Sequence, residues 1–509
     1  MTSTTSLPER VRVLVVGAGF AGLGAAIKLD EAGQADFLVL DKGTSVGGTW
    51  RDNTYPGAAC DVPSQLYSFS FAPNPNWSRS FSPQPEIHAY LQDVARSSGV
   101  LDRFRFGVTV EDAAWDETDQ VWTVTTSAGT VTADVVISGS GGLSEPKNPE
   151  IKGIDGFTGE IFHTARWDHD VDLAGKRVAI IGTGASAIQV IPEIAKTVGH
   201  LDVYQRTAPW VMPRHDRAYT RVEKLGFRFL PGLQKLYRTA IYWGRETYVP
   251  GFVKAPAILT PAKTMALANI KKGISDPELQ RKVTPDFQIG CKRILISNTY
   301  YPALAQANVD VITDGIAEIT PTGIVTSTGE TRDIDVLIVA TGFYTTDQPI
   351  AHHIKGRDGR TLGDVWAEHG MASYKGTTAA GFPNLFQIVG ANTGLGHSSM
   401  VFMIESQIAY ILDALAQMGA RQLATVEPTP EAQKSWNEDM QRRMRSTVWS
   451  TGGCASWYLD EHGRNTTLWP RTTFAFRGLL RSFDIEKYVV TARSDAPVSK
   501  ANTEKESVA

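Results

Sequence analysis

The chain has little cysteine and no strong excess of one charge. Its three cysteines, Cys60, Cys291 and Cys454, lie far apart and form no C-x-x-C pair. This spacing predicts neither a disulfide framework nor a redox-active pair nor a zinc site, and it favours a reducing, cytoplasmic setting. The 50 Lys and Arg residues against 54 Asp and Glu residues leave a net charge of −4. That balance argues against nucleic acid or an anionic membrane as a partner.

Long apolar runs are missing as well. Residues 1–12 hold no apolar core of the signal-peptide type, and the most apolar later stretch, Met400 to Leu415, is interrupted by charged and polar side chains. We therefore expect a soluble protein without stable membrane association. A length of 509 residues predicts two or three domains, and the small, charged segment 492–509 is expected to be disordered.

A strand, turn and helix pattern lies near the N-terminus. The apolar run 11–16 ends in a G-x-G-x-x-G turn, and residues 23–29 behind it have helical character. Such glycines let a pyrophosphate approach the amides at a helix N-terminus. A second strand, 37–40, ends 24 residues after the first glycine in an acid that suits ribose hydroxyls. The alternative is a structural turn with a surface acid. The predicted contacts of this first dinucleotide site are Gly17, Gly19, Phe20, Ala21, Gly22 and Asp41.

The segment 47–67 is too rich in glycine, proline and aromatic residues for a helix. At the phosphate end of a βαβ unit, such a segment favours a loop that covers the ligand. Its aromatic residues Trp50 and Tyr67 fit that loop and an ordinary core equally well. Asp61 is different, because a carboxylate in an apolar loop needs a positive partner. We expect further cofactor contacts from Gly48, Thr49, Trp50, Asp61, Tyr67, Val110 and Met400.

A second strand, turn and helix pattern repeats the first. The run 177–181 ends in a G-x-G-x-x-A turn, and a strand at 201–204 delivers Arg206, 24 residues after Gly182. A guanidinium at this position suits the 2′-phosphate of NADP, whereas the acid of the first site suits a free ribose. The first site is therefore predicted to hold FAD and the second NADPH. The expected contacts of the second site are Gly182, Thr183, Gly184, Ala185, Ser186, Gln189, Arg206 and Thr207.

The rest of the chain predicts an insertion and a return to the first domain. Residues 214–287 have a helical period, and these helices either wall a substrate pocket or pack on the sheet. After further strands, the glycine-rich loop 390–399 leads into a helix capped by Ser398 or Ser399. That helix end either stabilises negative charge on a flavin or is a capped surface helix. The aromatic loop 454–470 covers a pocket or fills an interdomain contact.

We therefore predict an α/β fold with two Rossmann-like dinucleotide-binding domains and a helical insertion. The expected boundaries are 1–148 and 346–491 for the FAD-binding domain, 149–213 and 290–345 for the NADP-binding domain, 214–289 for the insertion and 492–509 for the tail.

Between the two glycine turns lies the stretch F-T-G-E-I-F-H-T-A-R-W-D, residues 157–168. It matches F-x-G-x-x-x-H-x-x-x-W-[P/D], a fingerprint of the class B flavoprotein (type I) Baeyer–Villiger monooxygenases. Phe157, Gly159, His163, Trp167 and Asp168 fill its fixed positions. With the two flanking dinucleotide patterns, the chain resembles this family over roughly residues 10–490. N-hydroxylating enzymes and heteroatom-oxidising flavin-containing monooxygenases carry related versions of the fingerprint.

The resemblance implies an enzyme in which NADPH reduces FAD and O2 adds to give a C4a-peroxyflavin anion. That anion attacks a ketone, and the Criegee adduct rearranges to an ester or lactone. The family's active arginine falls on Arg293 and the acid that orients it on Asp61, while Lys292 joins Arg206 at the 2′-phosphate. A neighbouring cation would keep the peroxide deprotonated. The alternative for Arg293 is an interdomain salt bridge without a chemical role.

Other outcomes remain open at this point. They are S- or N-oxygenation, NADPH oxidation that yields only H2O2, and a flavin-binding redox sensor without turnover. For residues 157–168 we expect a joint between the two domains rather than the catalytic centre, with Gly159 allowing a turn and Phe157 and Trp167 as anchors. His163 is not expected to act as a general base, because no proton has to be removed from the ketone. Trp457 is placed at the pocket only by the resemblance.

Overall fold

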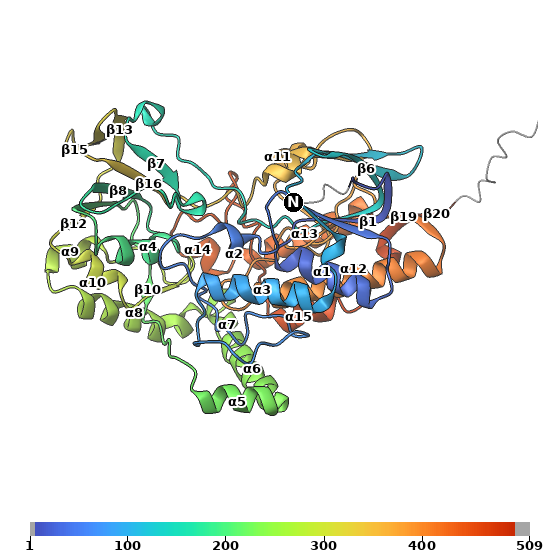
Figure 1. The fold of residues 1–509 in the computed structure, drawn as a ribbon, viewed down its shortest axis with the longest axis horizontal. Coiled ribbons are helices and arrows are strands. Elements are labelled where there is room, and N and C mark those ends of the chain that lie inside the picture. Colours follow the sequence, from blue (N-terminus) through green and yellow to red (C-terminus); the bar gives the residue numbers. More distant parts are fainter. Residues whose placement is uncertain (1–5, 494–509) are drawn as a thin grey trace, which may run out of the picture.

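The structure is a computed structural model that describes residues 6–493. Figure 1 shows two sheets on opposite sides of the molecule and a group of helices that projects below them. The carboxyl ends of the central strands in both sheets lead into the predicted glycine turns. The predicted tail falls almost wholly outside the described residues, since only its first two positions, 492 and 493, belong to them.

The first sheet has eight strands, which come from the N-terminal segment and from two later returns of the chain. They are β1 (Arg10–Val16), β2 (Phe37–Asp41), β3 (Phe104–Phe106), β4 (Val110–Asp116), β5 (Val121–Thr126), β6 (Gly129–Ser138), β17 (Ile354–Lys355) and β18 (Leu385–Gln387). Their order is β17-β4-β5-β6-β1-β2-β3, and β18 also pairs with β6. β1 is buried on both faces, as expected for a central parallel strand, because Val13 and Val15 enter one apolar cluster and Leu14 the opposite one.

The second sheet has five strands, and all of its pairs are parallel. They are β7 (Glu160–His163), β8 (Arg177–Ile181), β9 (His200–Tyr204), β12 (Val309–Ile312) and β16 (Val336–Val339). The order is β12-β9-β8-β16-β7. A separate antiparallel meander precedes β16 and consists of β13 (Ile316–Thr320), β14 (Gly323–Thr326) and β15 (Thr331–Asp333).

The two sheets repeat one topology. The order β6-β1-β2-β3 in the first corresponds to β16-β8-β9-β12 in the second. Each glycine turn therefore follows the equivalent strand, β1 or β8. The α/β fold with two dinucleotide-binding units, predicted from the repeated pattern, is confirmed.

Helices pack around the sheets, and two short pairs of strands form small separate sheets. The helices outside the insertion are α1 (Phe20–Glu31), α2 (Thr49–Asp52), α3 (Gln84–Ser98), α4 (Ala187–Ile194), α10 (Tyr300–Leu304), α11 (Leu362–His369), α12 (Met400–Ala420), α13 (Pro430–Met444), α14 (Val448–Thr451) and α15 (Thr473–Leu479). The short pairs are β10 (Val211–Met212) with β11 (Leu295–Ile296) and β19 (Leu423–Pro428) with β20 (Tyr488–Ala492). α1 lies against α12, so the N-terminal and C-terminal parts of the chain share the largest core.

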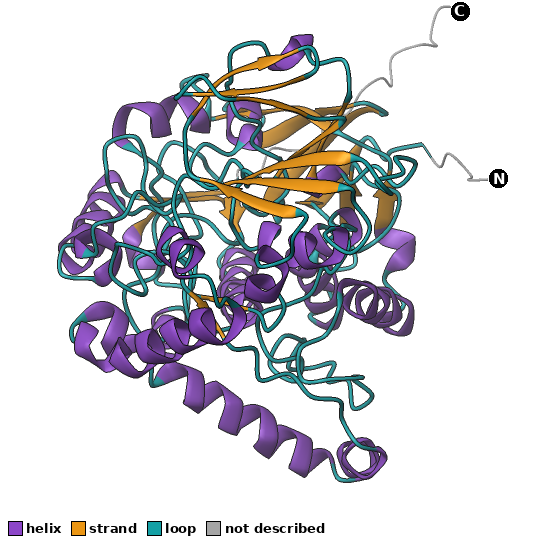
Figure 2. Ribbon diagram, turned by 90° about the vertical axis from the view of Figure 1, so that its left-hand side faces the viewer, coloured by secondary structure: helices purple, strands orange, loops and turns teal. Residues whose placement is uncertain are grey.

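The helical insertion lies between β10 and β11, as the change of period predicts. It contains α5 (Arg221–Phe229), α6 (Pro231–Glu246), α7 (Val249–Val253), α8 (Thr260–Gly273) and α9 (Pro277–Lys282). α5 and α6 form the part that projects farthest from the sheets, at the bottom of Figure 1 and of Figure 2. Within residues 6–493, no helix has both the length and the apolar character needed to cross a bilayer.

One local expectation is wrong. Residues 47–67 do contain a short helix, α2, which begins directly after Gly48. Gly159 lies in a bend directly before β7, which agrees with the expected turn, although its φ is not positive. It is required by a close approach, because a Cβ at this position would lie 2.3 Å from the carbonyl oxygen of Asp335. An alanine there would push β7 away from the chain that leads into β16.

Candidate active site

The first glycine turn is closed tightly by the backbone. Gly17 has φ +103°, and a Cβ on it would lie 2.6 Å from the carbonyl oxygen of Gly139. A Cβ on Gly22 would lie 1.7 Å from the carbonyl oxygen of Gly17. α1 begins at Phe20 without a side-chain cap, so its first amides point into the space above the turn. This arrangement fits a pyrophosphate, whose oxygens accept hydrogen bonds from such amides.

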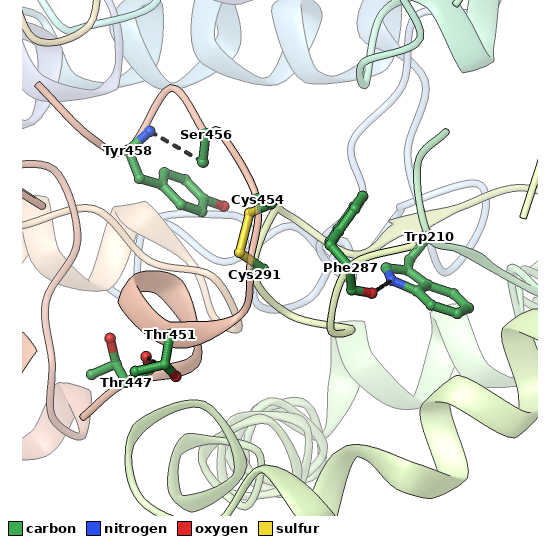
Figure 3. The surroundings of a disulfide bond; sticks show 8 residues. All are labelled: Trp210, Phe287, Cys291, Thr447, Thr451, Cys454, Ser456 and Tyr458. Carbon is green, nitrogen blue, oxygen red and sulfur yellow. Dashed lines mark hydrogen bonds between the residues drawn. A yellow bond between two sulfur atoms is a disulfide. The ribbon is translucent and has the colours of Figure 1, made fainter. Parts of the chain in front are cut away.

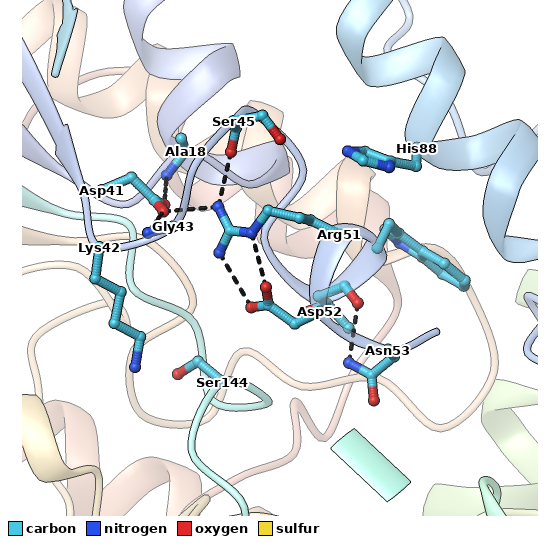
Figure 4. Close-up of polar contacts among 12 residues, drawn as sticks. Ala18, Asp41, Lys42, Gly43, Ser45, Arg51, Asp52, Asn53, His88 and Ser144 are labelled. Carbon is cyan, nitrogen blue, oxygen red and sulfur yellow. Dashed lines mark hydrogen bonds and ion pairs between the residues drawn. The ribbon is translucent and has the colours of Figure 1, made fainter. Parts of the chain in front are cut away.

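Asp41 lies at the end of β2 beside this turn, and Figure 4 shows its contacts. Its carboxylate accepts hydrogen bonds from the amides of Ala18 at 2.6 Å and Gly43 at 2.7 Å, and from Arg51 at 2.7 Å. The sequence reasoning did not single out Arg51, although it directly follows Trp50. Arg51 also forms two hydrogen bonds with Asp52, at 2.7 Å and 3.1 Å. Asp41 therefore helps to shape the turn, and its bond to a ribose stays a prediction.

The loop 47–67 lies across the turn. Gly48 has φ +53°, and a Cβ on it would lie 2.9 Å from the Cα of Gly19. Thr49 and Trp50 begin α2, and the indole of Trp50 donates to the hydroxyl of Tyr67 at 3.0 Å. The ring of Tyr67 meets Phe20 edge-on, with 5.2 Å between their centroids. These aromatic residues wall one side of the site while they pack on the core, so the two alternatives for them do not exclude each other.

The loop that leads into α12 closes the opposite side. Ser399 caps this helix by accepting a hydrogen bond from the amide of Val401 at 3.2 Å. The buried hydroxyl of Ser398 has no partner within the described part of the chain. Met400 begins α12 and Val110 begins β4, and both are half-buried. The unused donors around the first turn fit FAD, which would accept their hydrogen bonds.

The second glycine turn is more open. Gly182 has φ +115°, and a Cβ on it would lie 2.5 Å from the carbonyl oxygen of Ala340. At Gly184, in contrast, an added Cβ meets no atom within 4 Å. α4 begins only at Ala187, after Ala185 and Ser186. Thr183 donates to the carbonyl oxygen of Thr207 at 3.0 Å, which joins the turn to the end of β9.

Two cations lie together beyond β9. Arg206 is exposed, and its charge adds to burial in lowering the pKa of Lys292, while Asp286 opposes the shift. The ammonium group of Lys292 also lies 5.2 Å from the centroid of the Phe287 ring. Neither cation forms an ion pair with a residue in the described range 6–493. Two adjacent cations that are not paired with an acid in the described part of the chain fit the 2′-phosphate of NADPH.

Gln189, on α4, contacts the first domain instead of the open turn. Its amide oxygen accepts from the hydroxyl of Tyr55 at 2.9 Å, and its amide nitrogen donates to the carbonyl oxygen of Ala59 at 3.0 Å. A Cβ on Gly57 would lie 2.5 Å from the carbonyl oxygen of Gln189. The side chain therefore holds loop 53–59 against α4, and its predicted contact with a cofactor remains untested.

The structure brings Arg293 and Asp61 together, although they are 232 residues apart. Nε and Nη2 of Arg293 each donate to one carboxylate oxygen of Asp61 at 2.7 Å. Nη1 donates to the carbonyl oxygen of Leu395 at 3.3 Å, in the loop before α12. Asp61 raises the pKa of Arg293, and Arg293 holds the pKa of Asp61 low although burial opposes this. Both groups are therefore charged, and Asp61 has the positive partner that its apolar loop requires.

Two further residues join this pair. The charge of Arg245, on α6, also acts on Asp61. Tyr458 is 1% exposed, and burial raises the pKa of its hydroxyl to about 12 although the charge of Arg293 opposes this. That hydroxyl has no hydrogen-bond partner among residues 6–493. Trp457, which the resemblance placed at the pocket, is 47% exposed. No sequence signal distinguished Tyr458 from its neighbour, because both are aromatic residues in the same loop.

A disulfide joins Cys291 to Cys454 (Figure 3). The prediction that the cysteines do not pair is therefore wrong, because the fold brings together two residues that are 163 positions apart. Cys291 lies two residues before Arg293, and Cys454 lies four before Tyr458. The bond ties the segment that carries Arg293 to the aromatic loop. The argument from the cysteines for a reducing compartment loses its support.

Residues 157–168 form the edge of the second sheet. His163 ends β7 and is 6% exposed, and its Nδ1 accepts from the amide of Ala165 at 3.0 Å. Burial lowers the pKa of His163 to about 4, so the imidazole is neutral near pH 7. Phe157 and Trp167 pack on opposite faces of the second sheet. Both aromatic anchors therefore belong to the second domain, and the coupling role of this stretch remains a prediction.

Comparisons with known proteins agree with this arrangement. A family model described as pyridine nucleotide-disulphide oxidoreductase matches residues 14–224. A Baeyer-Villiger monooxygenase from Streptomyces coelicolor is 51% identical over 502 residues, which cover 98% of this chain and 96% of the relative. A Baeyer-Villiger monooxygenase from Pseudomonas aeruginosa is 50% identical over 499 residues, which cover 97% of this chain and 94% of the relative.

Solved structures agree in fold. Cyclohexanone monooxygenase from Rhodococcus sp. Phi1 bound to NADP+ superposes with a TM-score of 0.85 at 29% identity, covering 96% of this chain and 100% of that one. Oxidized steroid monooxygenase bound to NADP superposes with a TM-score of 0.82 at 32% identity, and the match covers 94% of this chain and 99% of that one.

The fold and the two glycine turns define a flavoprotein with paired dinucleotide-binding domains. At half identity over nearly the whole length, the chain belongs to the Baeyer–Villiger monooxygenase family. The predicted resemblance, enzyme class and cofactor pair, FAD and NADPH, are thereby confirmed.

Proposed function

We propose that this monooxygenase converts a ketone into an ester or lactone, using NADPH and O2, at the Arg293–Asp61 pair. The observation that carries the proposal is a half-buried guanidinium held by both carboxylate oxygens, where the first-domain loop, the segment after the insertion and the loop before α12 meet. When bound, the reduced flavin supplies the activated oxygen that attacks the ketone carbonyl.

Arg293 supplies a fixed positive charge. Asp61 raises its pKa, so the guanidinium stays protonated at any working pH. Asp61 accepts hydrogen bonds from Nε and Nη2 of Arg293, while Nη1 of Arg293 donates only to the carbonyl oxygen of Leu395 at 3.3 Å. The second hydrogen of Nη1 is thus available to the oxygen on which negative charge develops. A positioned donor of this kind contributes about 3–4 kcal/mol to the transition state.

The neighbouring groups hold this arrangement. Tyr458 lies beside Arg293 with an unused hydroxyl, and the disulfide fixes its loop to the segment of Arg293. Arg206, Lys292 and Thr207 would hold the 2′-phosphate of NADPH. We assign the FAD-binding domain to 1–148 and 346–491, and the NADP-binding domain to 149–213 and 290–345.

The test is product analysis of the holoenzyme with linear, cyclic and aryl ketones and with a sulfide. The wild type should form ester from at least one ketone. Arg293→Ala should retain FAD and still oxidise NADPH, while ester formation falls by about 10²–10³-fold and H2O2 appears instead. Arg10→Ala, which removes an arginine that is 63% exposed, should behave like the wild type.

Two outcomes contradict the proposal. Sulfoxide without ester from any tested ketone would make the protein an S-oxygenating enzyme. Normal ester formation by Arg293→Ala would leave the Arg293–Asp61 pair with only a structural role. Asp61→Asn keeps the shape but removes the charge, so it should also lose ester formation. Its thermal midpoint must be measured alongside, because breaking a half-buried pair also destabilises the fold.

A further inference from the structure

The pair α5–α6 presents its apolar side chains to solvent. Five of these side chains are more than half exposed: Val222 at 78%, Leu225 at 54%, Phe229 at 69%, Leu230 at 60% and Leu236 at 67%. Leu233, which is 45% exposed, lies between them in the chain. Isolated exposed apolar residues are normal, but a contiguous group marks an interaction site. We call these six residues the α5–α6 apolar face.

The spacing places these residues on one side of each helix. Val222, Leu225 and Phe229 follow the i, i+3, i+7 pattern on α5. On α6, Leu233 and Leu236 continue to Trp243, which is 52% exposed and packs on Phe474 of α15 at 5.6 Å. Helical residues at these intervals form a continuous stripe.

The inner side of the same helices is firmly held by polar and apolar contacts. Gln234 is 5% exposed, and its amide donates to Gln65 and to the carbonyl oxygen of Asn74, both at 2.8 Å. Arg238 donates to the carbonyl oxygens of Gln65 at 2.7 Å and Ser68 at 3.0 Å. Phe227, Tyr237, Ile241 and Tyr242 of the same helices pack on the largest apolar core, so the pair carries apolar residues on its inner side as well as on its outer side. The apolar face is therefore held outward by specific bonds.

The charge around this face has one sign. Residues 217–238 contain six Lys and Arg and a single acid, Glu223, which pairs with Arg217 at 2.6 Å. Arg221, Lys224, Arg228 and Lys235 form no ion pair with any residue of the described range. The net charge of −4 for the whole chain conceals this local excess. The expectation that the protein has no membrane partner rested on the charge balance of the whole chain.

From the apolar stripe and its rim of cations, we propose that the α5–α6 apolar face docks on an anionic lipid surface. A helix with an apolar face flanked by Lys and Arg lies in the plane of a membrane interface. Each Lys or Arg near such a surface strengthens binding about fivefold. A second copy of the chain is disfavoured as occupant, because it would bring two identical cationic rims together. The inference does not depend on the proposed function.

The test is flotation of the FAD-loaded protein with vesicles of equal parts phosphatidylcholine and phosphatidylglycerol, and with phosphatidylcholine alone. The wild type should float with the anionic vesicles and be partly released by high salt. The triple variant Leu225→Ser/Phe229→Ser/Leu236→Ser should bind at least about tenfold more weakly. In the variant Lys224→Gln/Arg228→Gln/Lys235→Gln, binding to the anionic vesicles should fall to the level that the wild type shows with phosphatidylcholine alone.

The matched control is Val489→Ser, at an apolar residue that is 50% exposed on β20, and it should float like the wild type. Flavin content should be unchanged in all variants, because the substituted side chains face solvent. The proposal is overturned if the wild type fails to float with anionic vesicles, or if the control loses binding as the triple variant does. It is also overturned if light scattering shows a dimer that the triple serine variant dissociates, since a second copy would then cover the face.

Discussion

The two dinucleotide-binding domains share one strand order but differ in how closely they surround their glycine turns. In the first, α1 begins at Phe20, three residues after Gly17, and a loop crosses directly above the turn. In the second, α4 begins at Ala187, five residues after Gly182, and no atom of residues 6–493 lies within 4 Å of the position of a Cβ on Gly184. The first site is enclosed by its own backbone and the second is open.

The charged residue near the end of the second strand also differs between the two domains, because it is enclosed in the first and open in the second. Asp41 is 8% exposed and accepts three hydrogen bonds, whereas Arg206 is exposed beside a second cation. An enclosed site suits a cofactor that stays bound through many reaction cycles. An open site with free cations suits one that must leave and be replaced. The comparison therefore supports the proposal that the closed turn holds FAD and the open one NADPH.

The strongest test of this contrast replaces one glycine in each turn. Gly22→Ala places a Cβ 1.7 Å from the carbonyl oxygen of Gly17, which cannot move without opening the turn. We expect a loss of about 3 kcal/mol or more in unfolding free energy, together with loss of flavin. The added Cβ of Gly184→Ala meets no described atom within 4 Å, so the unfolding free energy should change by less than about 1 kcal/mol. Flavin absorbance per protein and urea unfolding measure both variants, and equal flavin content would contradict the contrast.

A smaller effect is expected from Arg51→Ala in the closed site. The change removes one of the three donors to Asp41 and leaves a buried carboxylate less well paired. This should cost about 1–3 kcal/mol of unfolding free energy and weaken flavin retention. Arg96→Ala, at a side chain that is 61% exposed on α3, should change stability by less than about 0.5 kcal/mol. If the two variants unfold alike in urea, Arg51 does not support the closed turn.

The smallest effect concerns the choice of cofactor in the open site. Arg206→Ala and Lys292→Ala each remove one cation from the 2′-phosphate position, and each should reduce the preference for NADPH over NADH by about 10–100-fold in kcat/KM. Flavin content should not change. Lys152→Ala, at a side chain that is 79% exposed in the second domain, serves as the control. An unchanged preference in either cation variant would remove that residue from the phosphate site.

Local patterns predicted most of the fold. The runs 11–16, 177–181 and 336–339 are strands, and the helix from Met400 is capped by Ser399, because alternation, glycine turns and caps act over only a few residues. The same local reasoning missed the disulfide. It also missed the inward position of Tyr458 and the outward position of Trp457, since nothing in the loop's composition says which aromatic residue faces Arg293.

The sequence by itself determined the two dinucleotide units, the sign of the charge after each second strand and the family fingerprint at 157–168. Only the tertiary structure decided how segments far apart in the chain meet. It joins Asp61 to Arg293 across 232 residues and Cys291 to Cys454 across 163. It also turns the leucines of α5 and α6 toward solvent. The reason is that backbone patterns are set between near neighbours, whereas burial and pairing depend on which surfaces the whole chain brings into contact.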